Sequence, residues 1–183
     1  MTKAMIIPGN GGRQINGSWY PSVKNALSDL GLEVIAKDMP DPELARKEFW
    51  LPFIEENIDD DSIIIGYSSG AVAALRYLED HSCSLLILIG LHYTDLGIES
   101  EKQSGYFDAP WEWEKVKKNT KKIVMFASQD DPFIPIEQPR FAKEKLNAEY
   151  HEFLNEGHFG ALKSKTSFPE VVSVVDQFIS GNL

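Results

Sequence analysis

The sequence predicts an α/β fold in which a mostly parallel sheet of six strands lies between helices on both faces. Short apolar runs bounded by Gly, Pro, Asp or Asn recur along the chain, and most are continuously apolar, as strands covered on both faces are. Segments with helical spacing separate these runs, which favours right-handed β-α-β crossovers. The sequence contains no internal repeat or linker, so we expect residues 1–183 to form a single domain.

The predicted strands, in chain order, cover residues 4–9, 32–40, 62–68, 85–91, 122–131 and 148–157. Helical spacing predicts helices over residues 19–31, 71–81, 139–147 and 169–180. In the first helix, Val23 and Leu27 share an apolar face, and Gly31 is placed to end the helix. The last helix carries Val171 and Val175 at helical spacing, although its β-branched content would also suit a strand.

One long segment, from His92 to about Thr120, breaks the alternation and is rich in aromatic side chains. Ligands of open parallel sheets bind outside the carboxyl ends of the strands, so we predict that this segment is a cap-like insertion over that edge. Trp111 and Trp113 are predicted to line a substrate pocket beneath it, and core packing of these rings is the alternative. Two further aromatic residues complete the predicted pocket, Phe133 and Phe159.

The acidic composition argues against several classes of partner. The chain has 18 Lys and Arg against 28 Asp and Glu, and its net charge of -10 repels phosphate backbones and anionic lipid. No apolar run approaches the roughly 18 to 20 residues that a membrane-spanning helix needs. Cys83 is the only cysteine and cannot form an internal disulfide, which favours a reduced compartment. We therefore expect a soluble, cytoplasmic monomer with no nucleic-acid or membrane partner.

The run "GYSSG", residues 66–70, places a serine between two glycines where a predicted strand turns into a predicted helix. A serine at such a turn adopts a strained backbone conformation that pushes its hydroxyl out of the sheet. Gly66 and Gly70 let the strand and the helix approach closely, and the helix directs its N-terminal amides towards negative charge near Ser68. We interpret the run as a nucleophile elbow with Ser68 as the nucleophile; a plain glycine-rich turn is the alternative.

A serine nucleophile needs a base and an acid that orients the base. His158 follows the last predicted strand in a glycine-flanked loop, so it is the predicted base. The acid is expected at the end of the preceding strand, where Asp130 and Asp131 are both candidates. The other histidines are interpreted as surface or packed residues: His81, His92 and His151.

Attack by the serine also requires donors for the negative charge that develops on the substrate oxygen. We predict an oxyanion hole formed by the backbone N–H of Ser69 and by Asn10 in the loop "PGNGG" after the first strand. This loop does not match G-x-G-x-x-G, which argues against a dinucleotide site. Cys83 is interpreted as a small buried residue and the acidic run 59–61 as a solvated turn. We predict no cofactor and no metal.

The chain resembles the family of small serine hydrolases with the α/β-hydrolase fold that includes retinoblastoma-binding protein 9. The resemblance spans essentially the whole chain and rests on the segments "PGNGG", "MPDP" with "WLPF", "GYSSGAVAALRY", "SGYFDAPWEWEK", "DDPFIP" and "GHF". It implies a triad of Ser68, Asp131 and His158. Asp131 is preferred over Asp130 because residues 131–135 match the D-x-x-[VI]-P run of many α/β-hydrolases. It also implies a minimal version of the fold without the first two antiparallel strands, with strand order 2-1-3-4-5-6.

The sequence thus predicts a serine hydrolase that cleaves a small acyl substrate, namely a carboxylic ester, a thioester or an amide, through an acyl-enzyme intermediate. A peptidase is an alternative within the same class. From another class, the alternative is an inactive α/β-hydrolase-fold protein that acts as a protein-interaction module. The L-x-C-x-E peptide that docks to the retinoblastoma protein is absent, because the corresponding stretch reads "ENIDDDS", so this partner is not expected.

Overall fold

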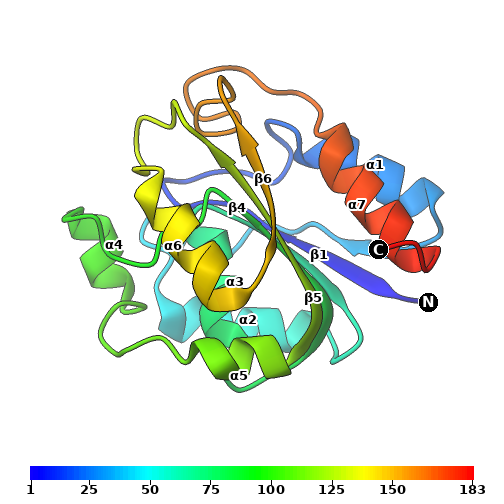
Figure 1. Cartoon of the computed structure of the whole chain (residues 1–183), viewed down its shortest axis with the longest axis horizontal. Coiled ribbons are helices and arrows are strands. Elements are labelled where there is room, and N and C mark those ends of the chain that lie inside the picture. The colour runs from blue at the N-terminus through cyan, green and yellow to red at the C-terminus, as the bar shows by residue number, and fades with distance from the viewer.

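The computed structural model describes residues 1–183 and contains one six-stranded sheet with helices on both faces (Figure 1). The strand order is β2-β1-β3-β4-β5-β6, and every neighbouring pair is parallel. The predicted order and number of strands are therefore confirmed. The strands are β1 (Lys3–Ile7), β2 (Glu33–Ile35), β3 (Ile63–Tyr67), β4 (Cys83–Ile89), β5 (Thr120–Ser128) and β6 (Glu149–Phe153).

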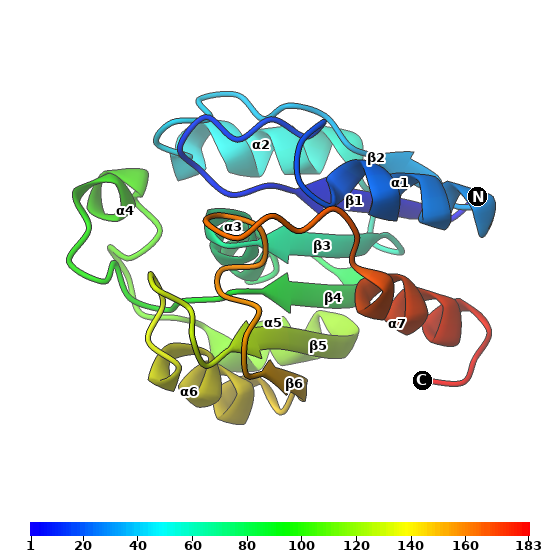
Figure 2. The same ribbon diagram turned by 90° about the horizontal axis from the view of Figure 1, so that it is seen from above.

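Two layers of helices cover the sheet. One face carries α1 (Tyr20–Asp29) and α7 (Pro169–Ile179), which lie side by side. The other face carries α2 (Lys47–Asn57), α3 (Ser69–Tyr77), α5 (Trp113–Lys118) and α6 (Glu137–Leu146). The remaining helix, α4 (Glu99–Ser104), lies beyond the carboxyl ends of the strands (Figure 2).

The continuous apolar runs of the strands follow from this layering. Side chains alternate between the two faces of a strand, and here each face packs against helices. In β3, Ile63 and Ile65 belong to the core beneath α1 and α7, whereas Ile64 belongs to the core beneath the other helices. All three are fully buried. Both sets of positions must therefore be apolar, which removes the alternation that a strand with one solvated face would show.

The helix α2 was not predicted from the sequence. It contains Pro52, which cannot donate a backbone hydrogen bond and interrupts a helical pattern. Its buried residues Trp50 and Ile54 pack into the same core as α3, and the Trp50 indole N–H donates to the Pro40 carbonyl at 2.6 Å. Tertiary packing thus supports a helix that the local sequence disfavours.

The segment from residue 92 to residue 120 divides into two parts. Its second part contains α5, which covers the sheet and buries Val116 in the core. Its first part contains α4 and extends past the sheet edge (Figure 2). Only this first part is placed to cover the carboxyl ends of the strands. None of the helices has the length and apolar character needed to cross a membrane.

Candidate active site

The turn between β3 and α3 is a strained elbow centred on Ser68. Its φ of 54° and ψ of -122° lie in a region that residues with a side chain rarely adopt. A Cβ on Gly66 would lie 2.5 Å from the Gly70 carbonyl oxygen, and a Cβ on Gly70 would collide with the carbonyl oxygens of residues 7 and 8 at the end of β1. Both glycines are therefore required by close packing. The Ser68 N–H donates to the Ile89 carbonyl at 2.8 Å, which ties the elbow to β4.

Three side chains form a hydrogen-bonded chain at this elbow. His158 Nε2 lies 3.0 Å from Ser68 Oγ, and His158 Nδ1 lies 2.6 Å from Asp131 Oδ2. The other oxygen of Asp131 accepts hydrogen bonds from the backbone N–H groups of Phe133 and Ile134 at 2.9 and 3.0 Å. A carboxylate so held accepts the hydrogen of Nδ1, which leaves Nε2 as the acceptor facing the serine hydroxyl.

The His158 loop is held by a hydrogen bond and lies close to the backbone after β4. The Tyr67 hydroxyl donates to the His158 carbonyl at 2.6 Å. Gly90, at the end of β4, has a φ of 60°, and a Cβ there would lie 3.3 Å from the imidazole Cε1. A side chain at this position would therefore be strained and would crowd the ring.

Asp130 has a different set of contacts from Asp131. Its Oδ1 accepts hydrogen bonds from the Ser128 hydroxyl at 2.6 Å and from the Gly157 N–H at 2.7 Å. These bonds, the Ser128 bond first, lower the pKa of the Asp130 carboxyl from its ordinary value. Asp130 thus links the end of β5 to the loop before His158, and the imidazole contacts Asp131 instead.

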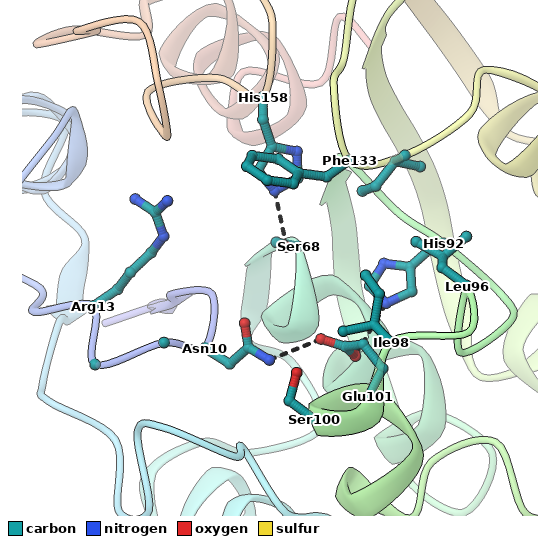
Figure 3. A pocket seen from close by; sticks show the side chains of 13 residues that line it. Asn10, Arg13, Ser68, His92, Leu96, Ile98, Ser100, Glu101, Phe133 and His158 are labelled. Carbon is teal, nitrogen blue, oxygen red and sulfur yellow. Dashed lines mark hydrogen bonds and ion pairs between the residues drawn. The ribbon is translucent and has the colours of Figure 1, made fainter.

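A cavity of about 490 Å³ opens above Ser68 (Figure 3). The loop after β1, the elbow, the first part of the segment after β4, and the loops after β5 and β6 all contribute to it. The lining residues are Asn10, Gly11, Gly12, Arg13, Ser68, His92, Leu96, Ile98, Ser100, Glu101, Phe133, Ile134 and His158. Ser68 and His158 therefore face a space large enough for a small molecule.

A second buried network lies on the other side of Ser68. Glu101 is only 5% exposed, and its Oε1 accepts hydrogen bonds from Asn10 Nδ2 at 2.7 Å and from Ser69 Oγ at 3.0 Å. Its Oε2 lies 3.1 Å from His92 Nε2. Burial alone would raise the pKa of Glu101, but the hydrogen bonds from His92, Ser69 and Asn10 outweigh it and lower the pKa from its ordinary value. The polar partners of Glu101 therefore favour the ionised carboxylate in this buried position.

The two predicted oxyanion residues lie beside the serine. Ser69 is the first residue of α3, so its backbone N–H has no acceptor within the helix. Asn10 lies in the loop after β1 and lines the cavity (Figure 3). The side chains of both residues are held by the same carboxylate, as described above.

The prediction that Trp111 and Trp113 line the pocket is corrected by the structure. Neither contributes to the cavity above Ser68, and both pack against the core beneath α3. The Trp111 ring covers the guanidinium of Arg76 at 3.7 Å from the ring centroid, and its indole N–H donates to the Tyr93 carbonyl at 2.7 Å. These contacts turn Trp111 towards α3, and Trp113 packs against Trp111 and Phe141, so core packing is the correct alternative for both.

The two predicted phenylalanines separate in the structure. Phe133 lines the cavity, and its ring stands edge-on to His158 with 5.2 Å between the ring centroids. Phe159 is fully buried and stacks on Phe168 with 5.4 Å between centroids, so its predicted place in the pocket is wrong. The backbone turns between His158 and Phe159, where φ is 45°, and sends the two side chains to opposite sides.

Among the cavity residues that the sequence does not assign to the site, His92 and Glu101 form a buried pair. The sequence predicts a surface or packed histidine at position 92; in the structure His92 is buried and also faces the cavity. Its position directly after β4 could have indicated this, since the carboxyl ends of parallel strands form the site edge. Glu101 carries no such signal, because "ESEK" reads as a solvated helix.

No group of three or more His, Cys, Asp or Glu side chains is arranged to hold a metal ion. Cys83 is buried at the start of β4, and burial raises the pKa of its thiol to about 12. A thiol with that pKa is a poor nucleophile near neutral pH.

Comparison with known proteins gives one consistent result. A family model described as serine hydrolase matches residues 4–177. The serine hydrolase RBBP9 of Rattus norvegicus is 44% identical over 183 residues, which cover 98% of this chain and 96% of the rat protein.

Two solved structures share the fold. The ydeN gene product of B. subtilis has a TM-score of 0.87 at 23% identity, with 98% of this chain and 100% of that chain covered. Est1E from Butyrivibrio proteoclasticus with bound ferulic acid has a TM-score of 0.74 at 15% identity, with 100% and 89% covered.

Proposed function

This chain belongs to the serine hydrolase family and has the α/β-hydrolase fold. We propose that it cleaves a small acyl substrate through Ser68, His158 and Asp131. The observation that carries the proposal is the chain of hydrogen bonds from Asp131 through His158 to Ser68 Oγ, at 2.6 and 3.0 Å. Both distances lie in the range needed for proton transfer between a nucleophile and its base.

In the acylation step, His158 Nε2 accepts the hydroxyl proton while Ser68 Oγ forms a bond to the substrate carbonyl carbon. The carbonyl π electrons move to oxygen, which becomes an anion. Asp131 keeps the imidazole in the tautomer that presents Nε2 to the serine, and its negative charge stabilises the imidazolium that forms. The imidazolium then donates its proton to the leaving oxygen, sulfur or nitrogen, and the acyl group stays on Ser68.

The negative charge on the substrate oxygen requires two donors close to the serine. The backbone N–H groups of Asn10 and Ser69 are our candidates. Their support is positional: Ser69 begins α3, where the helix dipole also favours negative charge, and Asn10 lies in the cavity wall.

Deacylation repeats these steps with water as the nucleophile. His158 removes a proton from the water, the oxygen attacks the acyl carbon, and the proton returns to Ser68 Oγ as the carboxylic acid leaves. Water reaches this position from the cavity, which is open to solvent above the serine.

The cavity supports a small acyl compound with an apolar part. Leu96 and Ile98 from the segment after β4 face Phe133 from the loop after β5 across the space above Ser68 (Figure 3). A carboxylic ester is the substrate class we propose first, because an alkoxide leaves more easily than an amide nitrogen. Thioesters and amides, including peptide bonds, are the compounds to compare with it.

The experiment that tests this function combines labelling and turnover. The wild-type protein should react covalently with a fluorophosphonate, and peptide mapping should place the adduct on Ser68. It should also hydrolyse at least one class in a panel of esters, thioesters and amides with acyl chains of increasing length. A folded wild-type protein that is neither labelled nor active on the panel would instead support the protein-interaction module.

We also propose that the protein works in the cytoplasm as a monomer. Its single cysteine is buried and reduced, which suits a compartment that keeps thiols reduced. Cell fractionation and analytical ultracentrifugation would test the two statements separately.

A further inference from the structure

Glu101 is a buried charge that the Ser68 triad does not use. Three segments that are separate in the sequence meet on its carboxylate: the loop after β1 through Asn10, the start of α3 through Ser69, and the segment after β4 through His92. Figure 3 shows the Glu101 side chain reaching from α4 towards Asn10, beneath the space that Ser68 faces. A buried charge persists only where such bonds compensate its lost hydration.

The partners of Glu101 Oε1 are the two residues assigned to the oxyanion hole. The carboxylate contacts their side chains, Asn10 Nδ2 and Ser69 Oγ, and leaves their backbone N–H groups free. The Asn10 N–H makes no hydrogen bond with another backbone group. A single rigid acceptor thus fixes both residues without occupying the donors that the substrate oxygen needs.

We propose that Glu101 is a positioning residue, which holds the Asn10 loop against the elbow so that the N–H groups of Asn10 and Ser69 point to one place. The inference rests on the proposed function, because it assigns a role in stabilising the oxyanion. Asn10 is flanked by Gly9 and Gly11, and Gly11 has a φ of 73°, so the backbone at this point is intrinsically permissive. Backbone hydrogen bonds at 3.3 and 3.1 Å hold Gly11 and Gly12 to the carbonyls of residues 43 and 42, and the Glu101 bond adds the contact that fixes Asn10 itself.

His92 makes this arrangement compatible with catalysis. An unbalanced carboxylate beside a developing oxyanion would repel it, especially in a site with little water. The hydrogen bond between His92 Nε2 and Oε2, with both side chains less than 10% exposed, withdraws negative charge from the side that faces the substrate. His92 also fixes the rotation of the carboxylate, so that Oε1 points to Asn10 and Ser69.

The test compares three substitutions at Glu101 with a control on the same helix. Glu101→Ala removes the acceptor and should lower kcat about 100-fold while KM changes less than about 3-fold, as expected when an oxyanion donor is displaced. Glu101→Gln keeps an oxygen that can accept from Asn10 and Ser69, so kcat should stay within about 10-fold of wild type. Glu99→Ala should behave as wild type, because Glu99 is exposed and its side chain accepts a hydrogen bond from Gln103 on the same helix.

Hydrogen–deuterium exchange gives a second measurement that does not need turnover. Within residues 9–13, the Gly11 and Gly12 amides donate to backbone carbonyls and are the ones that can lose protection. In Glu101→Ala they should exchange faster than in wild type, whereas Glu101→Gln should leave them close to wild type. Unchanged exchange at residues 9–13, or a kcat within about 3-fold of wild type despite a lower Tm, would overturn the positioning role. If Glu101→Ala does not fold, Glu101→Asp is the deciding variant, because it keeps the carboxylate but shortens the side chain by one methylene. We expect at least a 10-fold fall in kcat, roughly as for a misplaced catalytic group. An unchanged kcat in this variant would overturn the positioning role.

The two proposals fail in different ways. Absence of labelling and turnover in the wild-type protein would contradict the hydrolase function, whereas exchange at residues 9–13 would still decide whether Glu101 clamps the loop. Normal wild-type turnover with an insensitive Glu101→Ala would contradict only the positioning role.

Discussion

Two buried histidine–carboxylate pairs lie on opposite sides of Ser68. In the first, His158 and Asp131 are 2.6 Å apart, and the second nitrogen of the imidazole reaches Ser68 Oγ. In the second, His92 and Glu101 are 3.1 Å apart, and the second nitrogen, Nδ1, is buried without a hydrogen-bond partner. The pair itself therefore does not define a role. The role depends on what the remaining polar atoms of the pair contact.

The two pairs contact their neighbours through different groups. In the His158–Asp131 pair the imidazole contacts the serine hydroxyl, which suits proton transfer. In the His92–Glu101 pair the carboxylate contacts Asn10 and Ser69, which suits placement of hydrogen-bond donors. Substitutions in the two pairs should accordingly reduce activity by very different factors.

The largest effects are expected at the serine and its base. Ser68→Ala and His158→Ala should each lower kcat by about 10⁶-fold, because members of a catalytic unit are non-additive and either loss removes the whole unit. Ser68→Ala should also abolish the fluorophosphonate adduct. Both measurements need a circular dichroism spectrum that shows a folded protein. Retention of the adduct in Ser68→Ala would assign the nucleophile to another residue.

Asp131→Asn should have the next largest effect. An amide at this position favours the wrong tautomer of His158, and kcat should fall by about 10⁴-fold with little change in KM. Asp130→Asn is the matched control, since Asp130 contacts Ser128 and Gly157 rather than the imidazole. Steady-state kinetics on one ester is sufficient. A greater loss in Asp130→Asn than in Asp131→Asn would contradict the observed pairing as the functional one.

His92→Ala should be far milder than His158→Ala. It leaves Glu101 able to hold Asn10 and Ser69 but removes the group that faces its second oxygen, so we expect a fall in kcat of about 10-fold. The same ester assay measures it. If His92→Ala were as damaging as His158→Ala, the contrast between the two pairs would disappear, and His92 would need a direct part in the chemistry.

The two parts of the segment from residue 92 to residue 120 should also respond differently. Ile98→Ala shortens a side chain in the cavity wall, so kcat/KM for long acyl chains should fall by about 5-fold relative to short ones, with no change in Tm. Trp111→Ala removes the ring over Arg76 and should destabilise the fold by about 2 kcal/mol without altering acyl preference. Urea unfolding measures the loss of stability, and the panel of acyl substrates measures the change in preference. A change in acyl preference in Trp111→Ala, with none in Ile98→Ala, would make the tryptophan a pocket residue after all.

The smallest effect concerns stability in acid. The folded-state pKa of Glu101 is lowered from its ordinary value of 4.5, so the pair stabilises the fold above that pH and loses this contribution as the pH falls through the folded-state pKa. Glu101→Gln has no carboxyl to titrate. The difference in unfolding free energy between wild type and Glu101→Gln should therefore be smaller at about pH 3 than at about pH 5. A constant difference in urea unfolding at the two pH values would indicate that folding does not lower the pKa of the Glu101 carboxyl.

The sequence by itself determined the sheet and the elbow. Continuous apolar runs require cover on both faces, and the structure has this cover at every residue of β3 and β4. The glycines around Ser68 follow from close backbone packing, which is a local requirement visible in five residues. Chain order and the ends of parallel strands then brought His158 and the neighbouring aspartates to the same edge, because all strands point in one direction.

Only the tertiary structure decided which side chains face the cavity. Neighbouring residues in a turn point to different sides, so the sequence could not separate Asp130 from Asp131, or His158 from Phe159, by spacing alone. Trp111 packs over Arg76, and Glu101 accepts a hydrogen bond from Asn10, which is 91 positions away in the chain. Such contacts depend on how a long segment folds back over the strand ends, and neither helical nor strand periodicity constrains that path.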